Sequence, residues 1–516
     1  MRDLKTTSSR ESGLDFRFLI FDFRLGAAAP NSKWSGGSQS RIENRKSKIF
    51  TKFSVFLLTL PALDFHAPAA APAPPPCRIE VVEKGTGWPV PLVELRTTNA
   101  VRFVTDNAGV VAFDLPELMG QEVWFDVNGY GYEREKDGLG YRGARFKMEA
   151  GKTFRVEVSR TIVAKRIGRI TGAGLFGESQ KTGRELNWKE SGEVGRDSVL
   201  TAVYMGRLFW LWGDTSLAKY PLGIFNSTSA TSALQPLSSF EPPLRLKLGH
   251  FRDKNGAIRG VAKMPGDGPT WLSGYVALKD ARGKERLVAT FSKIRNHLEE
   301  YERGLCVWND ETESFELLRV LWTKPGGGTK GEKNQKPPPS PTGNPVLWKD
   351  EQGKEWVLFG NPFPVLRCPA TFEAWQDSTT WELLKPQETV RAAAGQANIQ
   401  PHTGAIAWNA YRQRWVTIFV QKFGKPSFLG EIWYAEAKSP TGPWGPAVKV
   451  LSHENYSFYN PQIHAGFTPS GSPVLFFEGT FTDEFANKPH PVPRYNYNQI
   501  LYRLDLDDAA LAPCRF

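Results

Sequence analysis

The chain has 516 residues, of which 40% are hydrophobic and 23% are charged. This length is enough for two or three domains with a substantial core, and the composition excludes a disordered chain. Glycine (48 residues), proline (38) and aromatic residues (12%) are plentiful, and no segment keeps a helical hydrophobic period for long, so an all-β fold is favoured.

The net charge of +11 is not concentrated in a basic helix or stripe. Residues 1–53 contain eleven Lys or Arg against five Asp or Glu, and a further basic stretch is the proline- and glycine-rich loop 324–341. Nucleic-acid binding depends on clustered contacts to phosphates. We therefore expect no nucleic-acid partner.

Residues 1–76 are predicted to be an N-terminal extension with a signal peptide. A basic segment, RKSKIFTK (45–52), precedes the apolar FSVFLLTLPAL (53–63) and the small residues of HAPAAAPAPPP (66–76). The apolar segment is too short to span a bilayer comfortably. We expect cleavage near residues 70–77, no membrane span afterwards, and a secreted, periplasmic or cell-surface protein; an uncleaved anchor is the alternative. Residues 1–42 make a poor leader, and we expect the true start nearer residue 45.

Residues 77–160 are predicted to form a small β-sandwich, because short alternating segments are separated by Gly, Pro, Asn or Asp. The stretch GWPVPLVELRTTNAVRFVTDNAGVVAFDL (87–115), followed by a later GY pair, resembles carboxypeptidase-regulatory, prealbumin-like modules. This resemblance implies a spacer or surface-presenting domain with no chemistry of its own.

Residues 165–516 are predicted to form a five-bladed β-propeller. Five β-rich clusters recur at intervals of about 45–75 residues, each with an apolar strand, a polar turn and a returning aromatic strand. The segment EIWYAEAKSPTGPWGPAVKVL (431–451) resembles the outer strands of glycoside hydrolase family 43 propellers. RDS (196–198), LWGDTS (211–216) and FNSTSA (225–230) are similar to domain-of-unknown-function family 4185, which includes glycosidases acting on D-arabinan. The resemblance spans most of 165–510 and implies a carbohydrate substrate or ligand; we also expect a monomer.

Two aspartates are the leading catalytic candidates. A hairpin over residues 197–214, turning at Met205 and Gly206, places Asp197 opposite Asp214. Both carboxylates are then expected at the rim of the propeller funnel, with one pKa raised and the other low. Carboxyl groups on directly opposed residues are close together, and this short distance predicts a retaining glycosidase, with Asp197 as nucleophile and Asp214 as general acid. Turn and cap roles for both aspartates are the structural alternative.

Further polar and aromatic residues are expected to line the same funnel. Glu478 is the third candidate carboxylate, because a charge after an apolar strand has little packing reason. The expected substrate-binding residues are Asn226, Trp271, His402, Glu431, Asn460 and His464. Each also has a structural alternative: a histidine hydrogen-bonded within a strand, a tryptophan of the hydrophobic core, or a residue at the exposed edge of a blade.

No cofactor is predicted, and a calcium ion in the funnel remains open. Cys77, Cys306, Cys368 and Cys514 are scattered, so no zinc site is indicated, while export permits disulfides of undetermined pairing. Two functions remain: a secreted glycoside hydrolase acting on a polysaccharide or glycan, and a catalytically inactive glycan-binding propeller at the cell surface.

Overall fold

The computed structural model describes residues 74–515, apart from 186–191, 235–239, 297, 326–334, 396, 426–427, 454–455 and 484–495. The expected signal peptide and half of the basic 324–341 loop, residues 326–334, therefore lie outside the described residues. The chain divides into Met1–Pro74 and Pro75–Phe516, and only the second unit is considered below. Within the described ranges, no helix is long and apolar enough to cross a membrane.

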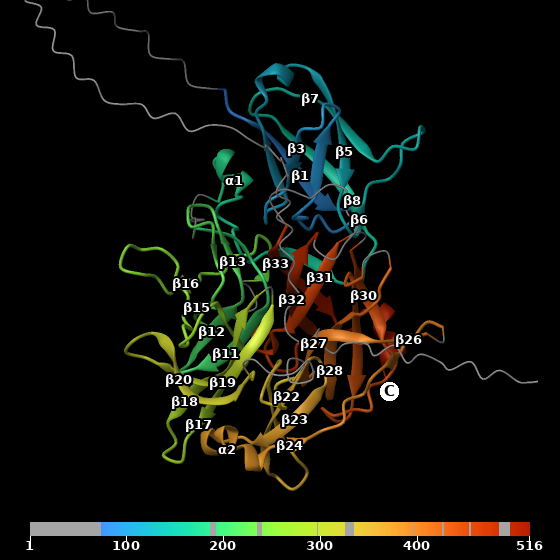
Figure 1. Cartoon of the computed structure of the whole chain (residues 1–516). Coiled ribbons are helices and arrows are strands. Elements are labelled where there is room, and N and C mark those ends of the chain that lie inside the picture. Colours follow the sequence, from blue (N-terminus) through green and yellow to red (C-terminus); the bar gives the residue numbers. More distant parts are fainter. Residues whose placement is uncertain are drawn as a thin grey trace, which may run out of the picture. The chain divides into compact units, whose positions relative to one another are not determined.

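The first part of the described chain is a β-sandwich of two four-stranded sheets (Figure 1). Phe103, Phe113 and Phe125 meet between the sheets, with ring centroids 5.3 and 5.5 Å apart. One sheet has the order β4(Val110–Phe113)-β1(Cys77–Glu83)-β8(Thr153–Arg160)-β6(Tyr132–Glu133). The other has the order β3(Arg102–Val104)-β2(Glu94–Thr97)-β5(Glu122–Asn128)-β7(Gly143–Lys147).

Five further four-stranded sheets follow and form the blades of a propeller. Blade 1 contains β11(Val199–Tyr204), β12(Arg207–Trp212), β15(Thr228–Ser232) and β16(Gly249–His250). Blade 2 contains β17(Thr270–Lys279), β18(Glu285–Arg295), β19(Glu299–Asn309) and β20(Ser314–Thr323). Blade 3 contains β21(Val346–Lys349), β22(Glu355–Gly360), β23(Pro364–Pro369) and β24(Glu382–Leu383). Blade 4 contains β27(Pro401–Asn409), β28(Arg414–Gln421), β29(Glu431–Ala437) and β30(Val448–Ser452). Together with blade 5 below, they confirm the predicted fold class.

Blade 5 is built from both ends of the propeller sequence. Its first three strands are β31(Ser457–Ile463), β32(Val474–Thr482) and β33(Asn498–Asp505), and its fourth is β9(Lys165–Arg169). In this antiparallel pairing Ile500 lies opposite Arg169, and Arg503 lies opposite Lys165. The earliest propeller strand therefore closes the ring against the last one.

The remaining elements are short. Two small sheets contain β10(Glu193–Arg196), β13(Thr215–Leu217) and β14(Gly223–Ile224), and β25(Val390–Arg391) with β26(Asn398–Ile399). The helices are α1(Glu178–Lys181), α2(Phe372–Gln376) and the 3-10 turns η1(Pro116–Leu118), η4(Ser378–Thr380), η5(Ala465–Phe467) and η6(Ala509–Cys514).

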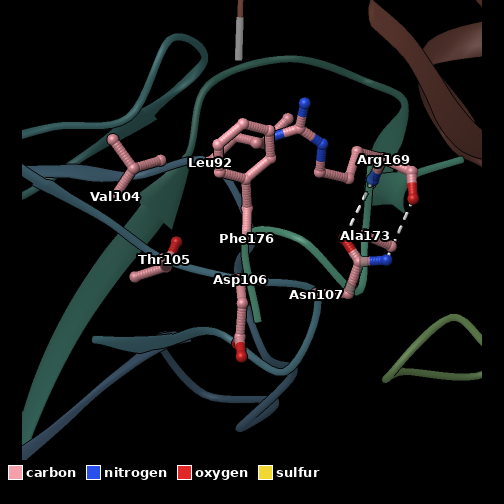
Figure 2. Close-up of a pocket in the computed structure, with 8 residues that line it drawn as sticks. All are labelled: Leu92, Val104, Thr105, Asp106, Asn107, Arg169, Ala173 and Phe176. Atoms are coloured by element: carbon pink, nitrogen blue, oxygen red, sulfur yellow. Dashed lines mark hydrogen bonds between the residues drawn. The ribbon is translucent and has the colours of Figure 1, made fainter. Parts of the chain in front are cut away.

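Strand β9 also joins the sandwich to the propeller. The side-chain amide of Asn107 accepts from the Arg169 backbone N–H at 2.9 Å and donates to the Arg169 carbonyl at 3.0 Å (Figure 2). This bidentate amide imitates the pairing of another strand. The cavity beside it is only about 10 Å³, room for at most one water molecule, so the contact is tightly packed.

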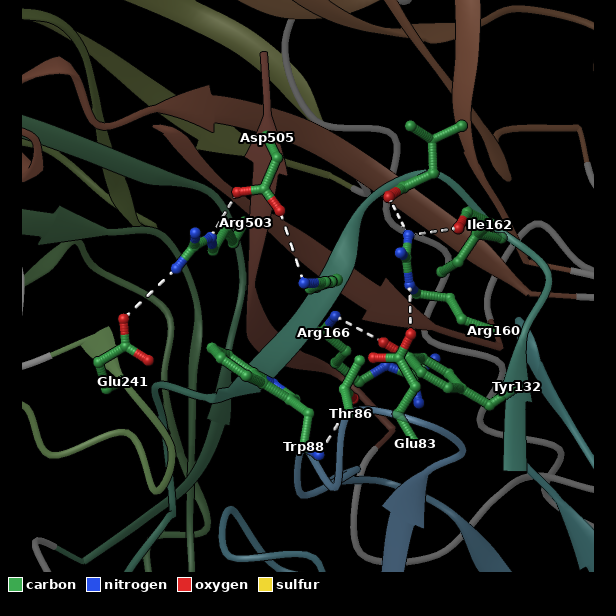
Figure 3. Close-up of polar contacts among 12 residues, drawn as sticks. Glu83, Thr86, Trp88, Tyr132, Arg160, Ile162, Arg166, Glu241, Arg503 and Asp505 are labelled. Atoms are coloured by element: carbon green, nitrogen blue, oxygen red, sulfur yellow. Dashed lines mark hydrogen bonds and ion pairs between the residues drawn. The ribbon is translucent and has the colours of Figure 1, made fainter. Parts of the chain in front are cut away.

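Arg166 makes the second connection, and Figure 3 shows its backbone N–H donating to the Tyr132 hydroxyl of the sandwich at 3.0 Å. Its guanidinium donates to the sandwich carbonyls of Pro91 and Gly129, at 3.1 and 3.0 Å, and to the hydroxyl of Tyr502 in blade 5, at 3.1 Å. The side chain is 1% exposed. Carbonyl groups of the sandwich that are removed from water therefore depend on this one charged donor.

We expect Arg166→Met to lower the free energy of unfolding by roughly 3 kcal/mol, because buried carbonyl groups lose their donor. Thermal and urea unfolding measure the effect. Arg155→Met is the matched control, since Arg155 is 55% exposed and its ion pair with Glu157 should contribute less than about 1 kcal/mol. Equal losses in the two variants would contradict a stabilising role for the Arg166 contacts.

Candidate active site

Neighbouring blades are joined by short polar links between residues on, or shortly before, their first strands. Asn460 of blade 5 donates from Nδ2 to Ser198 Oγ of blade 1 at 2.6 Å, and from its backbone N–H to Thr403 Oγ1 of blade 4 at 3.1 Å. The Gly343 N–H donates to Ser273 Oγ at 2.7 Å, which links blades 3 and 2. Small polar residues and glycine suit these positions because the backbones come too close together for large side chains.

The hairpin of blade 1 carries the two candidate aspartates. Val199 lies opposite Trp212, and Tyr204 lies opposite Arg207, so the turn is at Met205 and Gly206 as predicted. The pairing continues beyond the blade, where Arg196 of β10 lies opposite Thr215 of β13. Asp197 and Asp214 are therefore opposed, which confirms the predicted register. They occupy a break between two sheets rather than the ends of the hairpin.

Asp197 lies where blade 1 meets blade 5. Its side chain is almost completely buried, at 1% exposure, and Oδ2 accepts a hydrogen bond from the Tyr459 hydroxyl of β31 at 3.3 Å. The carboxyl group lies against Gly213, where an added Cβ would come within 2.4 Å of Oδ1. The adjacent Ser198 N–H donates to Thr480 Oγ1 of β32 at 2.9 Å. Blade 5 thus fixes the position of this carboxyl group.

Asp214 lies where blade 1 meets blade 2. Its Oδ1 accepts a hydrogen bond from the indole N–H of Trp271 at 3.1 Å, and the same N–H reaches the Phe225 carbonyl at 3.0 Å. Asp214 is half-buried and is the more exposed of the pair. The two opposed carboxyl groups are therefore held by different neighbouring blades.

The pKa values of both aspartates are raised. Burial raises the pKa of Asp197 well above its usual range, and the charge of Asp214 raises it further. Burial also raises the pKa of Asp214, to about 7, although the Trp271 hydrogen bond lowers it. Asp214 is then the first of the pair to ionise, while Asp197 keeps its proton. This order of pKa values is the opposite of the predicted one, because Asp197, the carboxyl group expected to project into the funnel, is the deeper one.

Three other predicted residues lie beside this pair or on the inner strands that surround it. Asn226 accepts the Thr270 N–H at 2.8 Å and so joins blade 1 to the start of β17. Asn460 contacts Ser198, directly after Asp197. His402 lies in the inner strand of blade 4, and burial lowers its pKa to about 4, helped by the charge of Lys422. A neutral imidazole is expected there at physiological pH.

Glu478 and His464 do not line the funnel, contrary to the sequence prediction. They form a pair at 2.9 Å, with both side chains 0% exposed. The His464 ring stacks on Phe467 and packs beside Trp210 of blade 1. Every residue of β32 is buried, since neighbouring blades cover both faces of this second strand. Glu478 is therefore paired with a core histidine, unlike the two aspartates; burial raises its pKa while His464 lowers it.

Two further expectations are changed by the structure. Glu431 begins the third strand of blade 4 and forms an ion pair with Lys449 of β30 at 3.1 Å, away from the inner strands. Trp271 is 6% exposed, which leaves little of its ring for stacking on a sugar. Its observed contact is the hydrogen bond that orients Asp214.

Several further residues, absent from the sequence predictions, contact this pair or lie on neighbouring segments. Tyr459 directly precedes Asn460, and successive side chains of a strand point to opposite faces, so the two residues serve different sides of the strand. This alternation is the signal that could have identified Tyr459. The hydroxyl of Tyr497 also contributes a hydrogen bond that lowers the pKa of Asp197. Phe225 and Tyr220, next to and within the β13–β14 connection, are 52% and 90% exposed. Aromatic side chains that remain exposed beside polar groups are suited to ligand contact.

The possible calcium ion of the sequence analysis would need oxygen ligands in the funnel. Across the described ranges, no three His, Cys, Asp or Glu side chains gather in a way that could hold a metal ion. Calcium normally requires six to eight oxygen ligands. Cys77, Cys306, Cys368 and Cys514 are all buried free thiols.

Neither a protein-family model nor a curated protein matches the chain. Several solved structures do. An exo-1,5-α-L-arabinanase from a bovine ruminal metagenomic library is 12% identical, covering 60% of this chain and 93% of its own, with a TM-score of 0.34. The family 43 glycoside hydrolase YxiA of Bacillus licheniformis is 13% identical, covering 60% and 71%, with a TM-score of 0.33. Arabinanase Arb43A of Bacillus subtilis is 12% identical, covering 61% and 96%, with a TM-score of 0.30. These values describe a coarse likeness, and the site rests on the geometry above.

Proposed function

We propose that the protein is a glycoside hydrolase that cleaves a polysaccharide or glycan at the Asp197–Asp214 pair. The observation that carries the proposal is the opposition of two carboxyl groups with raised pKa values, each oriented by an aromatic donor from a different blade. Two carboxyl groups with separate proton affinities are what glycoside hydrolysis requires. The leader-like residues 45–76 support an exported enzyme.

The roles follow from the order of ionisation. Asp214 ionises first and is more exposed, so it attacks the anomeric carbon as the nucleophile. Asp197 keeps its proton and protonates the leaving oxygen as the general acid. After the leaving group departs, the ionised Asp197 takes a proton from water, and the resulting hydroxide equivalent releases the sugar from Asp214. Exposed Phe225 and Tyr220 supply apolar faces for neighbouring sugar rings.

We expect Asp197→Asn and Asp214→Asn each to lower kcat roughly 10²–10⁴-fold, because each removes a proton donor or a nucleophile. The measurement is sugar release from a panel of plant, algal and arabinan polysaccharides. Asp507→Asn, at an exposed position after β33, is the control and should keep full activity.

A second substrate separates the two roles. An activated aryl glycoside of the released sugar needs no protonation of its leaving group, so it should restore cleavage by Asp197→Asn but not by Asp214→Asn. Full activity in either variant would remove the pair from the mechanism. Binding of a polysaccharide without cleavage by the unaltered protein would support the inactive glycan-binding propeller instead.

The pH profile of kcat/KM should be bell-shaped. Activity rises as Asp214 ionises, with an apparent pKa of about 7, and falls at higher pH, where Asp197 loses its proton. Trp271→Phe removes a hydrogen bond that favours the ionised Asp214, so the rising limb should move to higher pH. Trp308→Phe is the matched control, because Trp308 is another buried blade 2 tryptophan that donates to an aspartate, Asp310. A shift of the same size in both variants would argue against a specific effect on Asp214.

The stereochemical outcome is expected to be retention. Directly opposed side chains favour a separation near the roughly 5–5.5 Å of retaining enzymes over the roughly 6.5–9.5 Å of inverting ones. Proton NMR of the first product formed should therefore show the anomer of the substrate. An inverted product would mean that a water molecule, not Asp214, attacks the sugar.

A further inference from the structure

The outer face of one sandwich sheet carries a hollow that the propeller chemistry does not use. Along β5, Val123, Phe125 and Val127 point into the core, so Trp124 and Asp126 point outward. The hollow has a volume of about 460 Å³. Its lining residues come from the β2–β3 connection, from β5 and from the loop before β7: Thr98, Trp124, Asp126, Asp137, Leu139 and Tyr141.

Two aromatic rings form one wall of the hollow. The rings of Trp124 and Tyr141 lie edge to face, with centroids 6.3 Å apart at 79°. Tyr141 is 59% exposed, and the neighbouring Leu139 is 84% exposed. Folding alone does not explain such large apolar surface at one place, because neither side chain reaches the sandwich core.

The loop that carries Tyr141 is held in place before any ligand arrives. Asp137 Oδ1 accepts the N–H groups of Leu139 and Tyr141, both at 2.9 Å. The Trp124 ring lies over Gly143, where an added Cβ would come within 2.1 Å of the ring. Glycine at this strand position therefore allows the indole to lie close to the sheet. A preformed wall loses little entropy on binding.

The polar side chains that line the hollow are the hydroxyl of Thr98 and the carboxylates of Asp126 and Asp137. Asp126 pairs through Oδ2 with Arg96 at 2.8 Å, so its charge is partly balanced. Asp137 is exposed on the other side of the hollow. Carboxylate oxygens accept hydrogen bonds from hydroxyl groups, whereas aromatic faces contact the C–H faces of sugar rings. A ligand that carries its own negative charge would be repelled by Asp137.

We infer that this hollow binds a neutral polysaccharide, through Trp124 and Tyr141 with hydroxyl acceptors from Asp126 and Asp137. The inference is independent of the proposed hydrolysis, because none of these residues belongs to the Asp197–Asp214 site. The sandwich would then hold a glycan by itself instead of acting only as a spacer.

The test is affinity electrophoresis of the full chain carrying Asp214→Asn, in native gels containing soluble arabinan, arabinogalactan or laminarin. At least one of these neutral polysaccharides should slow migration, and polygalacturonate should not. Adding Tyr141→Ala or Trp124→Ala should raise the apparent Kd about 3- to 10-fold. Trp408→Ala, which truncates a 46% exposed tryptophan of blade 4, should leave the Kd unchanged.

Tyr141→Ala keeps the test valid even if Trp124→Ala disturbs the sheet, since the exposed Tyr141 ring lies outside the core. No retardation by any of the three neutral polysaccharides, equal retardation by polygalacturonate, or an unchanged Kd in Tyr141→Ala would overturn the inference. Hydrolysis of a small aryl glycoside by Tyr141→Ala in the otherwise unaltered chain reports on the propeller separately. Loss of one function therefore does not imitate loss of the other.

Discussion

The pairing of β9 with β33 is the contact on which the candidate site depends. It closes the ring of blades, and ring closure brings blade 5 against the first hairpin of blade 1. Tyr459 and Thr480 can then reach Asp197 and Ser198, although more than 250 residues separate them in the chain. Without this closure Asp197 would keep its strand neighbour Asp214 but lose the donors that orient it. The same strand holds the sandwich through Asn107 and Arg166, so one short segment serves three parts of the fold.

The propeller contains buried carboxyl groups in two different electrostatic situations. Glu478 has His464 at 2.9 Å and is surrounded by aromatic rings, so its charge has a local partner in the core. Asp197 and Asp214 have neutral donors and each other, and neither forms an ion pair with a cation within the described residues. Like charges brought together away from water favour a shared proton. Only the second arrangement is suited to proton transfer at neutral pH.

Much of the fold could be predicted from the sequence because its signals are local. Strand alternation, polar turns and the two-residue turn at Met205 and Gly206 are sufficient to establish the five blades and the opposition of Asp197 and Asp214. The pairing of β9 with β33 could not be predicted, because the sequence of a five-residue strand does not specify a partner strand more than 300 residues away. The prediction that Glu478 lines the funnel is wrong for a related reason. The pattern of apolar and polar residues does not show whether one face or both faces of a strand are covered by neighbouring blades. The roles proposed for the aspartates also depend on how deeply each carboxyl group is buried, which strand position does not reveal.

The backbone beside Asp197 is strained. Ser198 and Asn460 both have left-handed backbone conformations, with φ of 45° and 49°, and their side chains are joined by a hydrogen bond. Asn tolerates this region better than Ser, whose Cβ makes it costly. Ser198 stands where the chain passes from β10 to β11, immediately after Asp197, so the strained residue is the one that changes the direction of the strand beside the carboxyl group. Such strain persists only where the surrounding contacts impose it. Here those contacts come from blade 5, so ring closure also maintains the bend that sets Asp197 against Asp214.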